Sequence, residues 1–495
     1  MALSTLFKAF FIHEDITYDC CDVPLLPSRK GSLKDDTNSK NYHAIAISSL
    51  LLKVLDNVIL ILWGNLLGSD CLQFGYKKES SGTQCSWMVL EVVSYYRRHD
   101  TTVKCATLDC TKAFDRCVFS TLFTKVLDRG VPAIIVRGLL SIYRKQRCWV
   151  RWMDRTISRN FGVTNSTRQG SCLSPCLFSV YLDELLTALR NRGVGCHVGD
   201  LFTGAGCFAD DLVLLSPTRD ALQIQLNICQ EYALKHNLEF STDPNPEKSK
   251  SKCLFFHQGK ENNPADVWLC GKPLPWVNKA SHLGHELDNS GNQEIDCSIA
   301  RAQFIGQSNE ILNMFEFAEP NQTLNAVQIY CCAWYGSCLW NLYGENAGKA
   351  YRSWSATIKM AHNLPRQCRT FIVENYLAGS LPSVRQIIIR RFIQFTQKLV
   401  TSENPVIWQL SNLAVTTVRS TTGLNVKNIR EEFGLDPLAD YKKLFFVEKS
   451  PIPRDGLDVI ELLDYLLYIR NVEIDTGDSN DIEEINSLIS KTCTA

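Results

Sequence analysis

The sequence predicts an α+β protein in which a small antiparallel sheet carries helices on one face and a mostly helical half follows it. Two observations lead to this prediction. Strand-like apolar runs and segments of helical periodicity occur in the order strand, helix, helix, hairpin, helix, strand between residues 101 and 256. Beyond about residue 295 the pattern is mostly helical. A chain of 495 residues is also too long for one hydrophobic core, so we expect several packed subdomains.

Each element of this order has a local signal in the sequence. The elements are a β-run that breaks at Asp109 and turns into a helix (101–115), a stretch of helical spacing (117–145), a strand, a Gly/Ser/Pro-marked loop and a helix (161–190), a strand-turn-strand (206–216), a helix (220–240) and a strand (253–256). Residues 1–100 mix helical and irregular patterns.

The composition is typical of a soluble globular protein, with 45% hydrophobic and 21% charged residues. The formal net charge of zero hides two unlike regions, because residues 451–495 carry ten acidic and three basic residues. The 21 cysteines are scattered and no secretory signal precedes them, so we expect reduced cysteines in an intracellular protein that is not secreted. No cysteine spacing indicates a zinc site.

The longest apolar run, AIAISSLLLKVLDNVILILW (44–63), is long enough to span a bilayer. It contains Lys53 and Asp56, and charges are rare within membrane spans. We therefore predict a buried amphipathic helix and no membrane association.

Three aspartates are candidates for one site. Asp210 and Asp211 lie side by side between apolar runs, and Asp109 ends a strand-like run that a small sheet can bring beside them. Unpaired charges in an apolar setting cost several kcal/mol, so a divalent cation with oxygen ligands would explain them. The alternative is a surface hairpin whose turn contains two aspartates.

Several motifs resemble the successive palm motifs of reverse transcriptases, and most closely those of non-LTR (LINE-type) retrotransposons. They are LDCTKAFD, RQGSCLSPCLFSVYLDEL, FADD, NPEKSKSKCLFF and SHLGHEL, in this order, and KNYHAIAISSLLLKVLD and FGYKKESSGTQC resemble the preceding fingers motifs. The resemblance covers roughly residues 20–290. It implies a right-hand polymerase fold with fingers (1–100), a palm (101–290) with a fingers insertion (about 116–165), a helical thumb (291–400) and a helical C-terminal region with the acidic tail (401–495).

The resemblance implies catalytic roles for four residues. Asp109 and Asp210 would bind two Mg²⁺ ions, or Mn²⁺ in their place, and Asp211 would support them. Lys250 would protonate the departing pyrophosphate. Lys248 and Lys252 lie close by, so a solvated lysine run is the alternative for this segment.

The resemblance to reverse transcriptases also implies a nucleotide pocket. Phe114 takes the place of an aromatic residue under the incoming sugar, where its ring would exclude a 2′-hydroxyl; viral RNA-dependent RNA polymerases have an aspartate there. Gln169 and Gly170 would line the pocket, and His43 stands where the family has an arginine that faces the triphosphate. The alternatives are a core aromatic residue at Phe114 and a strand break at Gly170.

The segment 136–170 carries eight cations against one acid, with aromatic residues between them. Arginines that neutralise phosphates beside rings that stack on bases would form a template track. The proposed contacts are Arg144, Arg147, Trp149, Arg151 and Arg168, and Gly284 lies in a turn that resembles the primer grip. The alternative is a solvated basic face.

The leading functional hypothesis is an RNA-directed DNA polymerase that takes deoxynucleotides, an RNA template and a DNA primer or target. We expect it in the nucleus or cytoplasm as a ribonucleoprotein, and we expect target nicking to need a separate endonuclease. The second hypothesis is a catalytically decayed, RNA-binding derivative. It is favoured by His43 and by Cys207, which replaces a glycine of the family pattern, and by the absence of recognisable flanking domains. An intron-encoded or telomere-type reverse transcriptase is a third possibility.

Overall fold

The computed structural model divides into two units. The first comprises Met1–Asp296 and Lys398–Asn412, and the second Cys297–Gln397 and Leu413–Ala495. The residues that the structure describes are 2–14, 16–29, 37–38, 41–152, 157–168, 170–257, 264–291, 293–370, 373–377, 381–434 and 438. The predicted acidic tail and residue Gln169 lie outside them.

A five-stranded sheet with the order β13-β10-β3-β9-β8 forms the centre of the first unit. Its strands are β3 (Val103–Asp109), β8 (Ala205–Phe208), β9 (Asp211–Ser216), β10 (Lys252–Phe256) and β13 (Trp276–Val277). The central strand β3 pairs antiparallel with both β9 and β10. Its apolar run is buried because the sheet is covered on both faces, which is typical of central strands.

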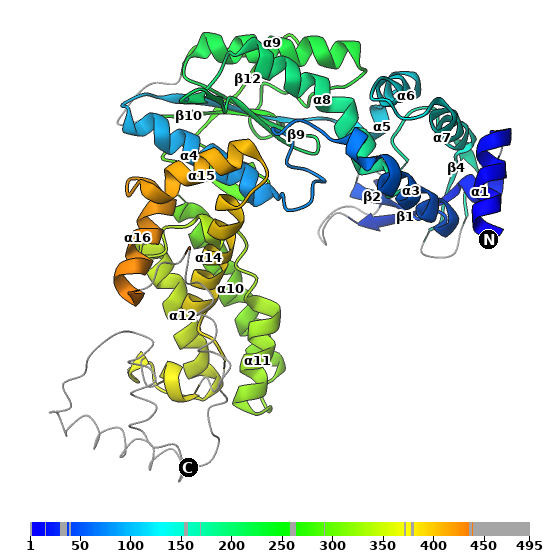
Figure 1. Cartoon of the computed structure of the whole chain (residues 1–495). Helices are drawn as coiled ribbons and strands as arrows, with labels where there is room; N and C mark the ends of the chain where they lie inside the picture. Colours follow the sequence, from blue (N-terminus) through cyan, green and yellow to red (C-terminus); the bar gives the residue numbers. More distant parts are fainter. Residues whose placement is uncertain are drawn as a thin grey trace. The chain divides into compact units, whose positions relative to one another are not determined.

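Helices cover this sheet. Helix α9 (Arg219–Lys235) contacts β3 and β9, and helices α8 (Ser174–Arg192) and α4 (Gly82–Arg98) contact β8. Figure 1 shows α8 and α9 on one side of the sheet and α4 on the other. The α+β class and the order of strands predicted from the sequence are confirmed, with helices on both faces rather than one.

The N-terminal segment and the predicted fingers insertion share a second sheet. Its order is β2-β1-β4-β5, in which β4 pairs parallel with β1. The strands are β1 (Asp22–Arg29), β2 (Tyr42–Ala46), β4 (Arg147–Val150) and β5 (Phe161–Gly162). Segments that lie over a hundred residues apart in the sequence therefore form one layer of the first unit (Figure 1). The boundary between fingers and palm stays a prediction.

The stretch 117–145 forms two helices rather than a continuous one. Helix α6 (Phe119–Asp128) ends before Gly130, whose φ is +86°, and Pro132 precedes helix α7 (Ala133–Lys145). Glycine tolerates the left-handed backbone and proline is compatible with a helix start, so this pair separates the helices. Helix α1 (Ala2–His13) packs against α7, and a side chain at Gly138 would collide with the ring of Phe11.

The apolar run 44–63 forms strand β2 and helix α3 (Leu50–Trp63), and only one face of the helix is buried. Leu52, Leu55 and Asp56 are buried, whereas the opposite face exposes Leu50 and Ile61 by 78% and 82%. The prediction of a buried amphipathic helix is therefore correct for the buried face of α3. It is wrong for the exposed face, which is apolar rather than polar. Among the described residues, one segment, Leu50–Leu67, is long and apolar enough to span a membrane by length and composition alone.

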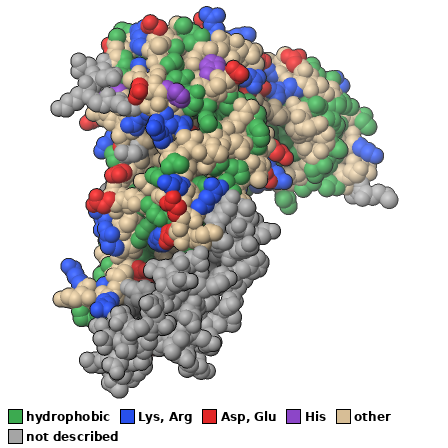
Figure 2. Space-filling view, turned by 60° about the vertical axis from the view of Figure 1, so that its left-hand side comes forward, with side chains coloured by type: hydrophobic (Ala, Val, Ile, Leu, Met, Phe, Trp, Pro, Cys, Tyr) green, Lys and Arg blue, Asp and Glu red, His purple; other side chains and the backbone are tan. Residues whose placement is uncertain are grey.

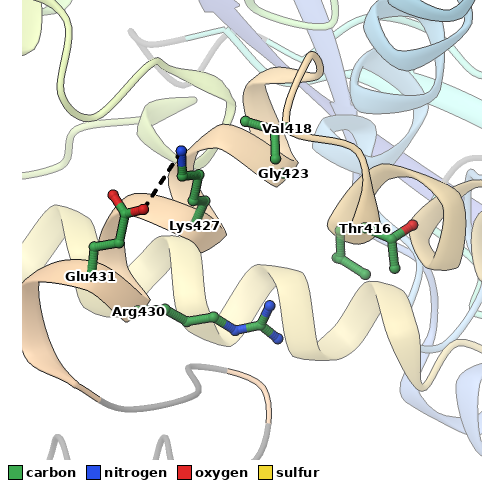
Figure 3. Close-up of a pocket in the computed structure, with 7 residues that line it drawn as sticks. Thr416, Val418, Gly423, Lys427, Arg430 and Glu431 are labelled. Carbon is green, nitrogen blue, oxygen red and sulfur yellow. Dashed lines mark ion pairs between the residues drawn. The ribbon is translucent and has the colours of Figure 1, made fainter.

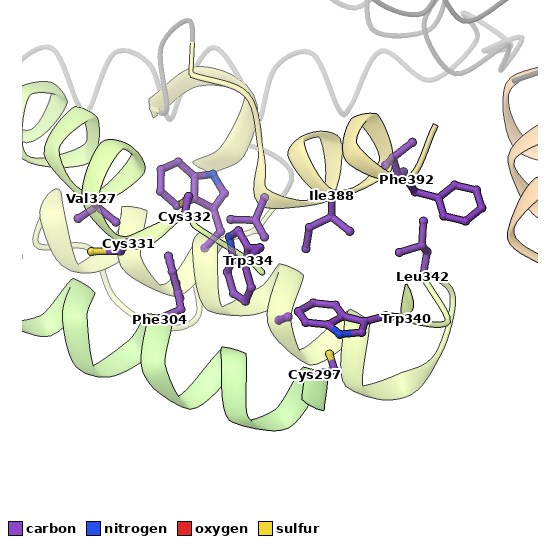
Figure 4. Packing of buried hydrophobic residues seen from close by; sticks show 14 of the residues in the cluster. Cys297, Phe304, Val327, Cys331, Cys332, Trp334, Trp340, Leu342, Ile388 and Phe392 are labelled. Atoms are coloured by element: carbon purple, nitrogen blue, oxygen red, sulfur yellow. The ribbon is translucent and has the colours of Figure 1, made fainter. Parts of the chain in front are cut away.

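The described part of the second unit is helical and has its own apolar core. Its main helices are α10 (Glu294–Met314), α11 (Pro320–Cys331), α12 (Glu345–Ala361), α14 (Val384–Val400) and α16 (Thr421–Phe433). Helix α15 (Pro405–Thr416) belongs to the first unit up to Asn412 and to the second unit from Leu413. Residues of α14 at helical spacing meet Trp340 and Trp354 in this core, part of which is drawn in Figure 4. The predicted palm–thumb boundary at 290/291 lies close to the division between the units at 296/297.

The second unit also contains a pocket of about 440 Å³ beside α16. Gly423, Lys427, Arg430 and Glu431 line it from the helix, and Val415, Thr416 and Val418 line it from the end of α15 and the turn that follows. Lys427 Nζ lies 3.5 Å from Glu431 Oε1, as the dashed line in Figure 3 shows. This pair lies one helical turn apart, so it stabilises the exposed face of α16.

The described cysteines are all free, and most of them are buried. Burial raises the pKa of Cys105 and of Cys229 well above the usual thiol value, so these side chains act as small apolar groups. On the face in Figure 2, Lys and Arg side chains lie among Asp and Glu side chains, in keeping with the zero net charge.

Candidate active site

The three predicted aspartates converge at one edge of the central sheet. Asp109 is the last residue of β3 and Asp211 the first of β9, and the two are direct partners in the antiparallel register. Asp210 lies in the turn between β8 and β9, next to Asp211. Because this register places Asp109 opposite the hairpin, residues about a hundred positions apart share a small region.

The hairpin turn has a strained backbone at Ala209, whose φ is +59°. A two-residue hairpin turn needs positive φ, and glycine or asparagine usually supplies it. Alanine in this conformation costs on the order of 1–2 kcal/mol, so neighbouring groups must stabilise the turn.

The carboxylates form an electrostatically crowded cluster. Burial, and then the charge of Asp109, raise the pKa of Asp210, although a bond from its own backbone opposes the shift. Burial raises the pKa of Asp211 to about 6, and the charges of Asp210 and Asp109 add to the effect. Lys250 Nζ lies 3.4 Å from both carboxylate oxygens of Asp109 and opposes these shifts. One lysine beside three carboxylates leaves an excess of negative charge.

The donor set fits a divalent cation that arrives with a substrate. No group of three or more His, Cys, Asp or Glu side chains in the described ranges is arranged to hold a metal ion by itself. Mg²⁺ usually binds one or two carboxylates and completes its shell with water and substrate phosphates. Oxygen ligands from Asp109 and Asp210 match that preference.

An aromatic cluster lies beside the carboxylates. Phe114 stacks on Phe178 with 4.2 Å between ring centroids and meets the edge of Tyr76 at 6.2 Å. Burial and the charge of Asp210 raise the pKa of the Tyr76 phenol, which indicates that Tyr76 lies near this carboxylate. The sequence motifs predicted Phe114 but not Tyr76, which lies within the fingers-like segment FGYKKESSGTQC (74–85).

The predicted nucleotide pocket is described only in part. Gly170 has φ of +80°, and an added Cβ would lie 2.5 Å from the Ala46 carbonyl oxygen. Glycine is therefore required here by contact with the protein backbone itself. His43 lies in β2 opposite Ser28, while its side chain and the whole of Gln169 lie outside the described residues.

One of the predicted nucleic-acid contacts is wrong. Arg168 is 1% exposed and forms a buried ion pair with Asp56 of helix α3. Asp56 also accepts hydrogen bonds from the Ser171 hydroxyl and the Cys172 amide. Arg168 is therefore the partner of Asp56, the lone acid of the apolar helix. Its guanidinium faces the interior, because separating the pair would leave the Asp56 charge buried and uncompensated.

The other four proposed contacts remain at least partly accessible. Arg144 and Arg151 are exposed and Trp149 is half-buried. Arg147 donates two hydrogen bonds of 2.8 Å to Asp22 and lies over the ring of Tyr18. The charge of Arg147 is thus already paired within the protein, and of the four arginines proposed as contacts, Arg144 and Arg151 are the exposed ones.

The SHLGHEL motif forms the β14 (Lys279–His282) and β15 (His285–Asp288) hairpin. Leu283 and Gly284 make its turn with φ of +52° and +81°, as type I′ turns require. Gly284 is exposed at the tip, where its backbone is accessible.

Together, the end of the central sheet, the aspartate hairpin and the lysine form the candidate active site. The family model "Reverse transcriptase (RNA-dependent DNA polymerase)" matches residues 30–287, and the chain belongs to this family.

Retrotransposon proteins are among its relatives. It is 26% identical over 204 residues to a Retrovirus-related Pol polyprotein from type-2 retrotransposable element R2DM of Drosophila melanogaster, covering 41% of this chain and 19% of that protein. It is 24% identical over 267 residues to the probable RNA-directed DNA polymerase from transposon X-element of Drosophila melanogaster, covering 52% and 27%. The predicted resemblance to non-LTR retrotransposon enzymes is confirmed, and the matched segments span about a fifth to a quarter of these relatives.

A solved structure of telomerase from Candida tropicalis in complex with a telomeric RNA fragment covers 82% of this chain and 67% of that chain. The identity is 10% and the TM-score is 0.41, so the likeness is too distant to bear on the site.

Proposed function

We propose that the protein is an RNA-directed DNA polymerase that extends a DNA 3′-hydroxyl with deoxynucleotides on an RNA template. The observation that carries the proposal is the direct pairing of Asp109 with Asp211, beside Asp210 in the hairpin turn, within a reverse transcriptase domain. In this reaction the primer oxygen attacks the α-phosphorus of the nucleotide, and pyrophosphate leaves.

The chain's own residues have distinct roles in this proposal. Asp109 and Asp210 supply oxygen ligands, and Asp211 adds negative charge beside them. Two bound divalent ions, Mg²⁺ or Mn²⁺, would stabilise the attacking and leaving oxygens of the phosphoryl transfer. Lys250, held at 3.4 Å from Asp109, would donate a proton to the departing pyrophosphate.

The sugar and the nucleic acids would meet other surfaces. The half-buried ring of Phe114 is held in place by Phe178 and would clash with a ribose 2′-hydroxyl. Arg144 and Arg151 would contact template phosphates, with Trp149 available for stacking. The exposed backbone at Gly284 would contact the primer strand.

Primer extension tests the proposal. A labelled DNA primer annealed to an RNA template is incubated with the protein, deoxynucleotides and Mg²⁺. We expect extension by the unmodified protein and by an Asp200→Asn control, and none by Asp210→Asn. Asp200 lies in the exposed turn between β6 (His197–Val198) and β7 (Leu201–Phe202). Equal extension by Asp210→Asn and the control would contradict the proposed site.

The decayed RNA-binding alternative is favoured by one sequence feature, the histidine at position 43. Imidazole is a weaker phosphate ligand than a guanidinium group. Cys207 gives it less support, because this side chain is buried and its thiol donates to the Ala209 carbonyl at 3.1 Å, so the site accommodates it. Salt-dependent RNA binding without extension, in both the unmodified protein and His43→Arg, would support decay.

A further inference from the structure

A short segment outside the palm strands contacts the aspartate hairpin directly. Gln73 forms a parallel bridge with Cys207 of β8. The Phe74 amide donates to the Cys207 carbonyl at 2.7 Å, and the Cys207 amide donates to the Leu72 carbonyl at 2.8 Å. The segment thus acts as one more strand partner at the free edge of β8.

The side chain of Gln73 holds the turn residue by both of its backbone groups. Gln73 Oε1 accepts from the Ala209 amide at 2.9 Å, and Gln73 Nε2 donates to the Ala209 carbonyl at 3.2 Å. Oε1 also accepts from the Gly75 amide at 2.8 Å, which fixes the side-chain carboxamide. Gln73 is fully buried, so water does not compete for these bonds.

Two neighbours complete this contact. An added Cβ at Gly75 would lie 2.3 Å from the Ala209 nitrogen, so the two backbones approach too closely for any side chain there. Nε2 of Gln73 lies 3.5 Å from Cys207 Sγ, whose thiol donates to the same Ala209 carbonyl. The carboxamide of Gln73 therefore compensates the backbone strain at Ala209.

We propose that Gln73 is a positioning residue for the metal-binding carboxylates: it acts through Ala209 and sets the direction of Asp210. The inference rests on the proposed polymerase function. Asp210 follows Ala209 directly, so the backbone angles of Ala209 determine where the Asp210 carboxylate lies. Without the hydrogen bonds from Gln73, the hairpin turn would sample other conformations. The Asp210 carboxylate would then spend less time in the position from which it can bind a divalent ion.

The test compares Gln73→Met with Gln225→Met. Both glutamines are fully buried in the first unit, and Gln225 makes similar bonds, with the Ser216 hydroxyl and the Gly204 carbonyl, away from the turn. We expect Gln73→Met to lower kcat for deoxynucleotide incorporation by about 10- to 100-fold and to raise the Mg²⁺ concentration for half-maximal rate, with the nucleotide KM within about twofold. Gln225→Met should lose stability without this change in the metal dependence.

Equal losses of kcat in the two variants, with unchanged Mg²⁺ dependence, would overturn the proposal and reduce Gln73 to a packing residue. Amide hydrogen exchange provides a readout that does not depend on activity. Gln73→Met should accelerate exchange of the Ala209 amide by roughly fivefold, and Gln225→Met should not. If the unmodified protein extends no primer, the proposed function fails, and faster exchange at Ala209 still supports the contact, whereas unchanged exchange refutes it.

Discussion

The substitution Asp211→Asn is expected to stabilise the protein at neutral and alkaline pH in the presence of a chelator. The pKa of Asp211 is raised from its ordinary value of 3.8 to about 6 by burial, and by the charges of Asp210 and Asp109. The folded state therefore holds this proton more tightly than the unfolded chain does. Ionisation of Asp211 destabilises the fold above about pH 6, and this destabilisation fades as the pH falls from about 6 towards 4.

The difference between the folded and unfolded pKa values corresponds to at most about 3 kcal/mol at pH 8. Urea denaturation of Asp211→Asn at pH 8 should thus give a free energy of unfolding up to that much higher than for the unmodified protein, and the gain should shrink by pH 4.5. Asp200→Asn, in an exposed hairpin turn, is the control and should change stability by less than about 0.5 kcal/mol. A gain at pH 8 that is absent, or that is independent of pH, would refute the electrostatic reasoning.

Three further predictions concern other parts of the chain. Arg168→Met should lower the free energy of unfolding by about 3–5 kcal/mol, because Asp56 is then buried without its cation, and a loss no greater than that of a surface variant would contradict this. Phe114→Val should raise ribonucleotide incorporation relative to deoxynucleotide incorporation by about 10-fold or more in single-nucleotide extension; an unchanged ratio argues against a sugar contact. Trp354→Ala should cost about 3–5 kcal/mol in denaturation because the side chain is fully buried in the core of the second unit, and near-neutral stability would mean that this core is not packed as described.

The sequence predicted the fold class, the strands of the palm and the convergence of the aspartates because these features have local signals. An apolar strand that ends in Asp109 and a hairpin around two acids are visible within a few residues each. The split of the segment 117–145 was also signalled locally by Gly130 and Pro132, which the periodicity obscured.

The errors and omissions involve long-range contacts. The charge pattern places Arg168 among basic neighbours and so predicts an exposed side chain. Asp56 in an apolar helix requires a buried cationic partner, and this requirement is the sequence signal for the Arg168–Asp56 pair. Gln73 and Tyr76 reach the aspartate hairpin from a loop more than a hundred residues away, and neither residue type indicates such a contact by itself. The pairing of this loop with the edge of β8 brings these residues to the hairpin, and no periodicity within either segment predicts that pairing.

In the proposed function, Asp109 and Asp210 hold the ions that promote nucleotide addition. Crystals of the protein with an RNA–DNA primer–template, a non-hydrolysable deoxynucleotide and Mn²⁺ would test it by anomalous scattering. Two manganese peaks in contact with carboxylate oxygens of Asp109 and Asp210 and with the triphosphate are the predicted result. Manganese bound to the triphosphate but away from both aspartates would contradict it.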